Sequence, residues 1–201
     1  NVESDYGNFM WEKILEVGEE FKIQPYGTEA LSTLRIEPGT VVEVNPGVEF
    51  DISFTNNGYR GALQAEGVTF TKADNAENWV GIQFREYTED SETYLNNCII
   101  EYADNGVYCE SSSPTLTNNI FRYNTDGVES DGGSNPKIFD NQFIDNNRPV
   151  MYYSHKLDST MYGNTYEDNE KNYIELVGEW IDWDNGVHVW PRDGAPYRVI
   201  Q

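Results

Sequence analysis

A fourfold repeat of about 22 residues constrains the fold of this chain more than any other feature. Four segments align without gaps over fourteen positions, and they read LNNCIIEYADNGVY, LTNNIFRYNTDGVE, IFDNQFIDNNRPVM and MYGNTYEDNEKNYI. They begin at Leu95, Leu116, Ile138 and Met161, which are 21, 22 and 23 positions apart. A unit this short cannot bury its own apolar face. The period therefore predicts a solenoid in which successive units stack.

Each repeat carries three apolar positions that are separated by polar residues. The first residue is always apolar, and large apolar or aromatic residues follow five and twelve positions later. They are Ile100, Phe121, Phe143 and Tyr166 in one column, and Val107, Val128, Val150 and Tyr173 in the other. The surrounding stretches are short and rich in β-forming residues, without a helical period. Each unit therefore predicts short strands with three inward contacts, and we expect the aromatic column to stack.

Two polar columns lie between the apolar ones and are dominated by asparagine. They are Cys98, Asn119, Asn141 and Asn164 at the third position after the anchor, and Ala103, Asn124, Asn146 and Asn169 at the eighth. Asparagine tolerates left-handed backbone, and its amide bonds to neighbouring main chain. We therefore predict asparagine ladders at the corners. The two cysteines allow one disulfide or two buried thiols, and a ladder that starts at Cys98 favours a partly buried, unbridged Cys98.

Two less regular units precede the four repeats. Leu63, Glu66, Val68 and Ile82 fall in the same columns, and the segment LRIEPGTVVEVNPGVEFDI, from Leu34, has Pro-Gly turns at its corners. The stretch TLRIEPGTVVEV resembles the lead-in coil of secreted bacterial β-helix proteins, and the repeats resemble those of the NosD-like and pectate-lyase-like superfamily. This resemblance implies an all-β fold, a right-handed parallel β-helix of about six coils over residues 34–177.

The two ends of the chain resemble each other. A pattern of Asp-x-Gly-x-x-x-Trp runs from Asp5 to Trp11 and again from Asp184 to Trp190, and Tyr197-Arg-Val-Ile-Gln parallels Phe21-Lys-Ile-Gln. We therefore assign residues 1–33 to an N-terminal strand or cap segment and 178–201 to a similar C-terminal one. The match fits a tandem array, a subunit whose ends dock head to tail, or coincidence. The assembly interpretation assigns contacts to Asp5, Trp11, Asp184, Trp190 and Tyr197.

The charge of the chain limits its partners. It has 13 Lys and Arg against 35 Asp and Glu, a net charge of −22. Such a field repels nucleic acid and anionic lipid, and no apolar run is long enough for membrane insertion. The expected partners are therefore a second copy of the chain or a polysaccharide. The resemblance to secreted proteins implies a location outside the cell or on its surface.

An acidic cluster beside two glycines offers a calcium site. Asp126, Glu129 and Asp131 provide several oxygen ligands next to Gly132 and Gly133, as flexible calcium loops do. The alternative is a solvated acidic turn in a chain that is acidic throughout. Calcium is the one cofactor that this pattern suggests.

A concentration of basic and aromatic residues follows in the next coil. It consists of Arg148, Tyr152, Tyr153, His155 and Lys156, and it lies where proline replaces the repeat's glycine. Aromatic rings beside a cation suit a sugar ring, and departures from a repeat are places where a function can be added. We therefore interpret these residues as a candidate carbohydrate-binding site. An unreactive loop histidine is the alternative.

No catalytic site is marked out by the sequence. Nucleophile, phosphate-loop and Cys-x-x-Cys patterns are absent, and no Ser or Cys nucleophile has a partner visible in the sequence. The favoured interpretation is therefore a secreted or surface structural or binding β-helix that assembles head to tail or belongs to a tandem array. The alternative is a carbohydrate-active domain that binds or cleaves a polysaccharide through its outer face.

Overall fold

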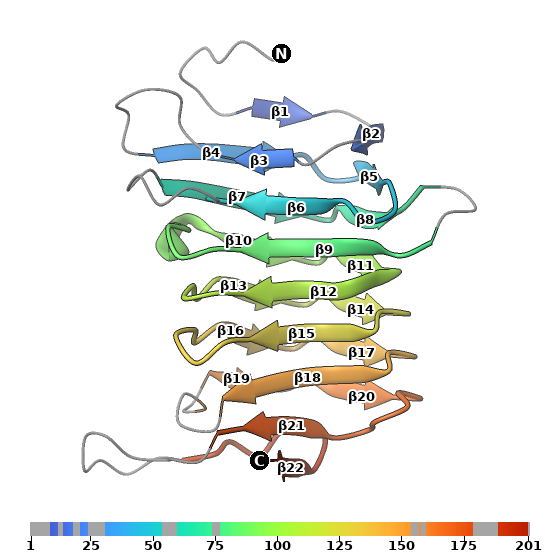
Figure 1. Ribbon diagram of the computed structural model, residues 1–201, viewed down its shortest axis with the longest axis vertical. Helices are drawn as coiled ribbons and strands as arrows, with labels where there is room; N and C mark the ends of the chain where they lie inside the picture. Colours follow the sequence, from blue (N-terminus) through green and yellow to red (C-terminus); the bar gives the residue numbers. More distant parts are fainter. Residues whose placement is uncertain are drawn as a thin grey trace.

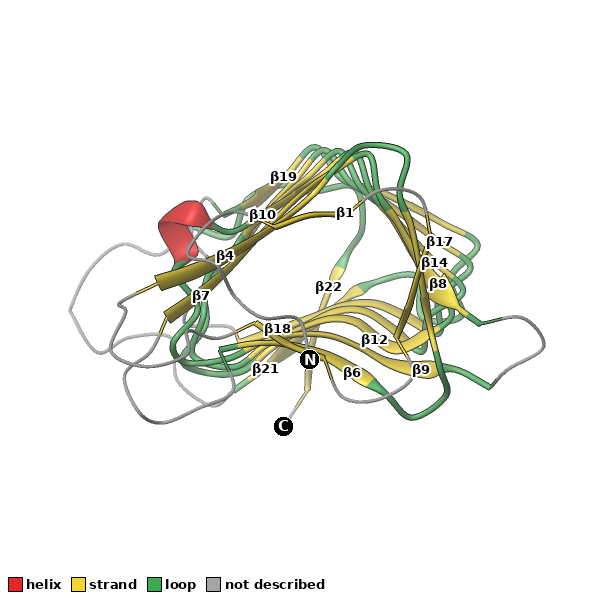
Figure 2. Cartoon of the chain, turned by 90° about the horizontal axis from the view of Figure 1, so that it is seen from above, coloured by secondary structure: helices red, strands yellow, loops and turns green. Residues whose placement is uncertain are grey.

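The computed structural model describes residues 9–11, 14–17, 21–23, 31–53, 60–73, 77–153, 157, 160–178 and 189–200, with side chains from residue 31 onward. Successive strands pass in turn to three parallel sheets, so that each set of three strands forms one coil. The coils lie one above another along the long axis (Figure 1), and the three sheets form a triangular outline when viewed down the stack (Figure 2). This architecture is a parallel β-helix.

Each sheet takes every third strand. Sheet A contains β1 (Phe9–Trp11), β4 (Leu31–Ile36), β7 (Arg60–Glu66), β10 (Tyr94–Asn96), β13 (Thr115–Thr117), β16 (Lys137–Phe139) and β19 (Met161–Tyr162). Sheet B contains β2 (Ile14–Val17), β5 (Val41–Val44), β8 (Thr69–Lys72), β11 (Ile99–Glu101), β14 (Ile120–Arg122), β17 (Gln142–Ile144) and β20 (Thr165–Glu167). Sheet C contains β3 (Phe21–Ile23), β6 (Glu49–Ile52), β9 (Trp79–Phe84), β12 (Ala103–Cys109), β15 (Asp126–Ser130), β18 (Arg148–Tyr153), β21 (Ile174–Val177) and β22 (Tyr197–Ile200). One 3₁₀ turn, η1 (Asp90–Glu92), interrupts the described strands.

The predicted fold class is confirmed. Strands β4 to β21 make six coils, and β1, β2 and β3 pair in parallel with β4, β5 and β6. The repeat sets the register: Leu95 pairs with Leu116, and Leu116 pairs with Ile138. A parallel pair in register places like side chains about 4.8 Å apart along the stack. One sequence column therefore becomes one column of side chains in space.

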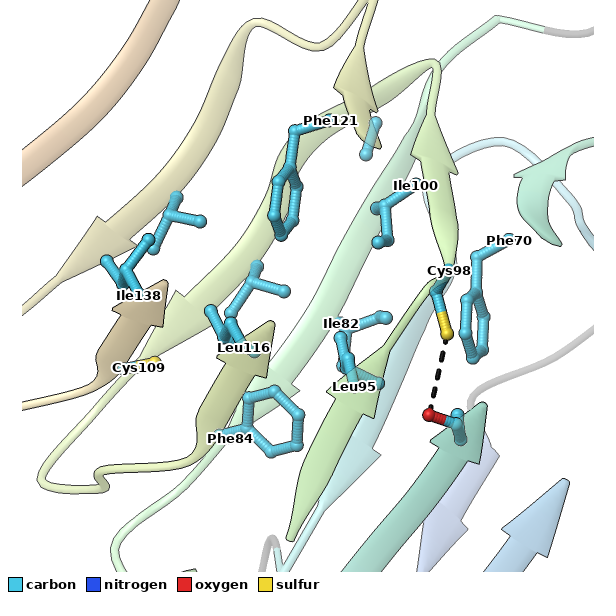
Figure 3. Close-up of a cluster of buried hydrophobic side chains, with 14 of the residues drawn as sticks. Phe70, Ile82, Phe84, Leu95, Cys98, Ile100, Cys109, Leu116, Phe121 and Ile138 are labelled. Atoms are coloured by element: carbon cyan, nitrogen blue, oxygen red, sulfur yellow. Dashed lines mark hydrogen bonds between the residues drawn. The ribbon is translucent and has the colours of Figure 1, made fainter. Parts of the chain in front are cut away.

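The apolar columns fill the interior between the three sheets. Leu95, Ile100, Leu116 and Phe121 all point into this space (Figure 3) and have no exposed surface. The predicted aromatic stack is present. The ring of Phe143 lies 5.1 Å from that of Phe121 and 5.3 Å from that of Tyr166, and in both pairs the rings are nearly parallel.

Two details of the predicted register are wrong. Leu95 pairs with Ala65 and Ile100 with Phe70, so the columns lie two residues beyond Leu63 and Val68. A slip of two keeps the same strand face inward, which is why both of those residues are still buried.

The second error concerns the last repeat. Val150 pairs with Ile174 rather than with Tyr173, because Ile174 lies eight positions after Tyr166 whereas Val150 lies seven positions after Phe143. The ring of Tyr173 therefore lies outside the core. The guanidinium carbon of Arg198 lies over this ring, 5.0 Å from its centroid.

Both predicted asparagine ladders are present. In the first, the Oδ1 atom of Asn141 accepts from the backbone N–H of Asn119 at 2.8 Å, and its Nδ2 atom donates to the carbonyl oxygen of Leu116 at 2.9 Å. Asn124, Asn146 and Asn169 repeat this arrangement at the next corner. The left-handed conformation belongs to the residue before each ladder position, for example Asn118 at φ 55° and Asp140 at φ 56°.

The two cysteines are unbridged, as the ladder predicted for Cys98. Both are buried, Cys98 completely rather than partly. The Sγ atom of Cys98 lies 3.5 Å from the carbonyl oxygen of Ala65 (Figure 3). Burial raises the pKa of the Cys98 thiol to about 11 and raises that of Cys109 as well. Both side chains therefore act as small apolar groups of the core.

Candidate functional site

The outer face of sheet C carries two clusters of charged side chains, on residues whose side chains point away from the core. The charged face, as we name it, comprises Glu49, Asp51, Arg85, Glu110, Asp126, Glu129, Arg148 and Glu175. An arginine lies at the centre of each of two groups of three carboxylates. Tyr108, in register between Gln83 and Glu129, stands between the two groups.

Arg148 organises the first group. Its Nε and Nη2 atoms donate to the two oxygens of Asp126 at 2.7 and 2.8 Å, a bidentate pair. Nη2 also lies 3.3 Å from Glu129 Oε2, and Nη1 donates to Glu175. Since Asp126 and Glu129 are on β15 and Glu175 is on β21, Arg148 on β18 ties three consecutive coils together.

The predicted calcium ligands are therefore divided between two roles. Asp126 and Glu129 bind the guanidinium of Arg148, whereas Asp131 accepts from the backbone N–H groups of Ser111 and Gly133 at 3.0 and 2.9 Å. Its carboxylate thus closes a turn. Among the described residues, no group of three or more His, Cys, Asp or Glu side chains is arranged to hold a metal ion.

The predicted carbohydrate-binding residues are also separated. Tyr152 points inward and is fully buried, and its hydroxyl donates to Asn135 Oδ1 at 2.7 Å. Burial raises the pKa of the Tyr152 hydroxyl. Tyr153 follows on the outward side of the strand, whereas His155 and Lys156 lie outside the described residues. The alternation of a strand thus separates the two neighbouring tyrosines.

The second group surrounds Arg85 and was not recognised in the sequence. Its Nε atom donates to Asp51 Oδ1 at 3.0 Å, Nη2 to Glu49 Oε2 at 3.1 Å, and Nη1 to Glu110 Oε2 at 3.0 Å. Glu49 and Asp51 lie on β6, Arg85 follows β9 and Glu110 follows β12. Arg85 therefore ties three coils together in the same way as Arg148.

Asp51 has the most unusual environment on the charged face. Its side chain has no exposed surface, and its Oδ2 atom makes no hydrogen bond. The Nε2 atom of Gln83, the in-register neighbour on β9, also lacks a partner. Burial raises the pKa of the Asp51 carboxyl to about 6, with Arg85 opposing the shift and Glu49 adding to it. A carboxyl with such a pKa can give or take a proton near neutral pH.

Burial also raises the pKa of Glu129, with a further contribution from the neighbouring Asp126. Arg148 keeps a raised pKa although burial acts against it, because Asp126 and Glu175 accept its hydrogen bonds. The guanidinium is therefore permanently charged. Chemically, each group on the charged face combines one arginine with three carboxylates, and the buried Asp51 is the member whose pKa is raised to about 6.

The residues predicted for assembly have different fates. Asp5 and Asp184 lie outside the described residues, and Trp11 ends strand β1. Trp190 and Tyr197 are partly buried and pack against the core of their own chain, with ring centroids 5.7 Å apart. The matching segments Phe21–Ile23 and Tyr197–Ile200 become β3 and β22, which are the two outermost strands of sheet C.

The chain is similar in sequence to part of two curated proteins. Two curated relatives, aminomethyltransferases of Thermoanaerobacter pseudethanolicus and of Thermoanaerobacter sp., are each 32% identical over 135 residues. Each match covers 57% of this chain but only 33% of the relative, so the chain spans about a third of their length. No solved structure matches.

No helix among the described residues is long and apolar enough to span a membrane. The family model for right-handed β-helix regions matches residues 36–179, which include every strand from β5 to β21. The match covers well over half of the chain, and the three parallel sheets have the architecture it describes. The chain therefore belongs to the right-handed β-helix region family.

Proposed function

We propose that this chain is a rigid structural or binding module rather than an enzyme. The observation that carries the proposal is the use of Arg85 and Arg148, each of which binds three carboxylates from the two coils on either side of its own. In these ion pairs, charged side chains of the outer face hold neighbouring coils together. Two buried asparagine ladders also link each coil to the next through hydrogen bonds at the corners. The product is a straight rod with a wide, acidic lateral surface.

The proposed place of action is outside the cell or on its surface, with a polysaccharide as the ligand of the lateral surface. The resemblance of the segment Thr33–Val44 to secreted β-helix proteins supports this location. The net charge of −22 favours neutral or cationic polymers over acidic ones. We do not assign the activity named for the two aminomethyltransferases to this chain, since the match spans a third of their length.

Binding and turnover assays on the same polysaccharides test this proposal. Neutral, cationic and acidic polysaccharides are immobilised for binding, and the same polymers are incubated with the protein in solution. New reducing ends report hydrolysis, and ultraviolet absorbance of a new double bond reports elimination. The module predicts binding to neutral or cationic polymers with neither product. Turnover of any of these polymers contradicts the proposal.

A carbohydrate-active domain is the second candidate, and Asp51 is the observation that favours it. A buried carboxyl with a pKa of about 6 beside an arginine suits a general acid or base. If turnover is found, Asp51→Asn should abolish it while the circular dichroism spectrum stays unchanged. Asp104→Asn, at an exposed position on β12 of the same sheet, is the matched control. Equal turnover by both variants removes Asp51 from the chemistry.

A further inference from the structure

Two tyrosines at one corner of the stack have a backbone conformation that suits asparagine and aspartate far better. Tyr102 and Tyr123 directly follow β11 and β14, where sheet B turns into sheet C (Figure 2), and their φ angles are 58° and 57°. The other non-glycine residues with positive φ in the described part of the chain are all serine, asparagine or aspartate. A bulky residue in this left-handed region costs free energy, and such outliers gather at functional sites.

The same corner position carries aspartate in the two following coils. Strands β14, β17 and β20 pair in register and end directly before Tyr123, Asp145 and Asp168. Both aspartates have a φ angle of 53°, close to that of the tyrosines. Equal backbone conformations, repeated at a strand spacing of about 4.8 Å, point the side chains of one column in the same direction. The fold therefore does not require tyrosine at this corner, and it places the carboxylate of Asp145 next to Tyr123.

The ring of Tyr123 is covered by Tyr102 on the side of the preceding coil. The two rings stack with centroids 5.2 Å apart and planes 16° from parallel, yet Tyr123 is 42% exposed. Arg122 lies 5.7 Å from the centroid of Tyr123, and its Nε atom donates to Glu101 of the preceding coil at 2.6 Å. On the side of the following coil, Asp145 is exposed and takes part in no ion pair with the described residues. An open aromatic surface thus adjoins a carboxylate that lacks a counter-charge.

The chain itself places an ammonium group at the other end of the tyrosine pair. The Nζ atom of Lys72 lies over the ring of Tyr102, 4.8 Å from its centroid. A cation over an aromatic ring is attracted by the negative face of the ring. At the Tyr123 end, the next side chain of the column is Asp145 instead of a cation. An ammonium group from a ligand would gain the attraction of both the ring and the carboxylate there.

We propose that Tyr123 and Asp145 bind an amino-sugar residue of a cationic polysaccharide, with the sugar ring against Tyr123 and its ammonium group beside Asp145. An amino sugar carries an apolar C–H face and a cation on one rigid ring, so it contacts both side chains at little cost in conformational entropy. A lysine side chain would lose more rotamer freedom in the same place. Asp168 offers a carboxylate to the next residue of the polymer. The proposal rests on the proposed binding function, for which it names a ligand class and a site.

Substitutions that suit the left-handed backbone test the site. Tyr123→Asn introduces a residue type that this conformation prefers, so the free energy of unfolding in urea should stay equal or rise. Its affinity for a trimer of β-1,4-linked glucosamine should nevertheless fall at least about fivefold, measured by calorimetry at mildly acidic pH and about 0.15 M salt. Asp145→Asn should weaken binding by a similar factor. The controls are Tyr162→Asn, at an exposed tyrosine of sheet A, and Asp140→Asn, at a left-handed aspartate of another corner. Both should bind like the parent.

Two further ligands identify the chemistry that is recognised. The fully N-acetylated trimer lacks the ammonium groups and should bind more weakly than the glucosamine trimer. A tri-lysine peptide carries ammonium groups without sugar rings and should lose little affinity in Tyr123→Asn.

Four results would overturn the amino-sugar site. They are equal affinities of the parent and Tyr123→Asn for the glucosamine trimer, a lower stability of Tyr123→Asn, equal binding of the acetylated trimer, and a tri-lysine peptide that depends on Tyr123 as strongly as the trimer does. None of these results removes the rigid binding module. The module fails instead if polysaccharides are turned over or if none of them binds.

Discussion

Asn141 makes hydrogen bonds that no apolar residue can replace. Its side chain accepts from the N–H of Asn119 and donates to the carbonyl of Leu116, both in the buried corner. A buried polar group left unpaired costs about 1–3 kcal/mol. Asn141→Ala should therefore lower the free energy of unfolding by about 2–4 kcal/mol in urea titrations. Lys137→Ala, at an exposed position on β16, should change it little. Equal stability of the two variants would show that the ladder is dispensable.

The column of stacked aromatic rings contributes to the stability of the core. Phe143 is fully buried between Phe121 and Tyr166. Truncation of a buried phenylalanine to alanine costs about 3–5 kcal/mol through lost transfer energy and a cavity. Phe143→Ala should show this loss in thermal and urea unfolding, whereas Gln142→Ala, exposed on the same strand, should not. A Phe143→Ala variant that melts like the parent would place the ring outside the core.

Asp51 gives a pH dependence of definite sign. The pKa of its carboxyl is raised from 3.8 to about 6 in the folded chain, so folding takes up a proton between these values. This group therefore destabilises the fold above pH 6, and its penalty is relieved as the pH falls from 6 towards 4. The relief is on the order of 3 kcal/mol. Measured against Asp51→Asn, the parent should gain unfolding free energy between pH 7 and pH 4. A constant difference contradicts the raised pKa.

The place of a single residue in the fold could be predicted where successive repeats have the same spacing, and it was predicted wrongly where the spacing changes. The columns of Phe121, Phe143 and Asn141 follow from counting, because equal coil lengths put equal positions in register. Tyr173 was misplaced since one additional turn residue shifts everything after it by one position. The environment of Asp51 was invisible, because the partners of its side chain come from other coils.

At the scale of strands, Arg148 joins β15, β18 and β21. Its side chain is 16% exposed and that of Glu175 only 6%. Arg148→Ala would leave three neighbouring carboxylates without a counter-charge, and removing one partner of a buried pair is costly. We expect a loss of about 1–3 kcal/mol in urea unfolding, after allowance for partial exposure. Arg35→Ala, whose pair with Glu37 is largely exposed, should lose less than about 0.5 kcal/mol. Similar losses would contradict a tying role for Arg148.

Elements of the regular coils were predicted well because each strand is short and each period repeats. The partners of Arg148 could be predicted only in part. Asp126 and Arg148 share one column of the aligned repeats and pair as in-register neighbours. Glu175 lies one position out of its column because of the longer turn, so its contact could not be read from the alignment. Of the acidic cluster in the sequence, Asp126 and Glu129 pair with Arg148, and Asp131 closes a turn.

For the whole molecule, the period specifies the interior but leaves the outer face free. Apolar columns must repeat for coils to stack, whereas outward residues vary without penalty to the stack, and fold therefore does not determine function. The pairing of Tyr152 with the core and of Tyr197 with the last coil depends on the assembled structure. Both tyrosines carried predicted binding roles, and in the fold both serve the stability of the stack.

The coils form a single rod in the register described, and cysteine cross-linking measures that register. Thr115 and Lys137 are in-register partners on the outward side of sheet A, whereas Gln142 lies on sheet B. Cys98 and Cys109 are buried and should not react in the folded chain. With a short thiol cross-linker, the double variant Thr115→Cys, Lys137→Cys should form an intramolecular cross-link in high yield, and Thr115→Cys, Gln142→Cys should not. Equal yields, or a cross-link only in the second variant, would contradict the stacked register.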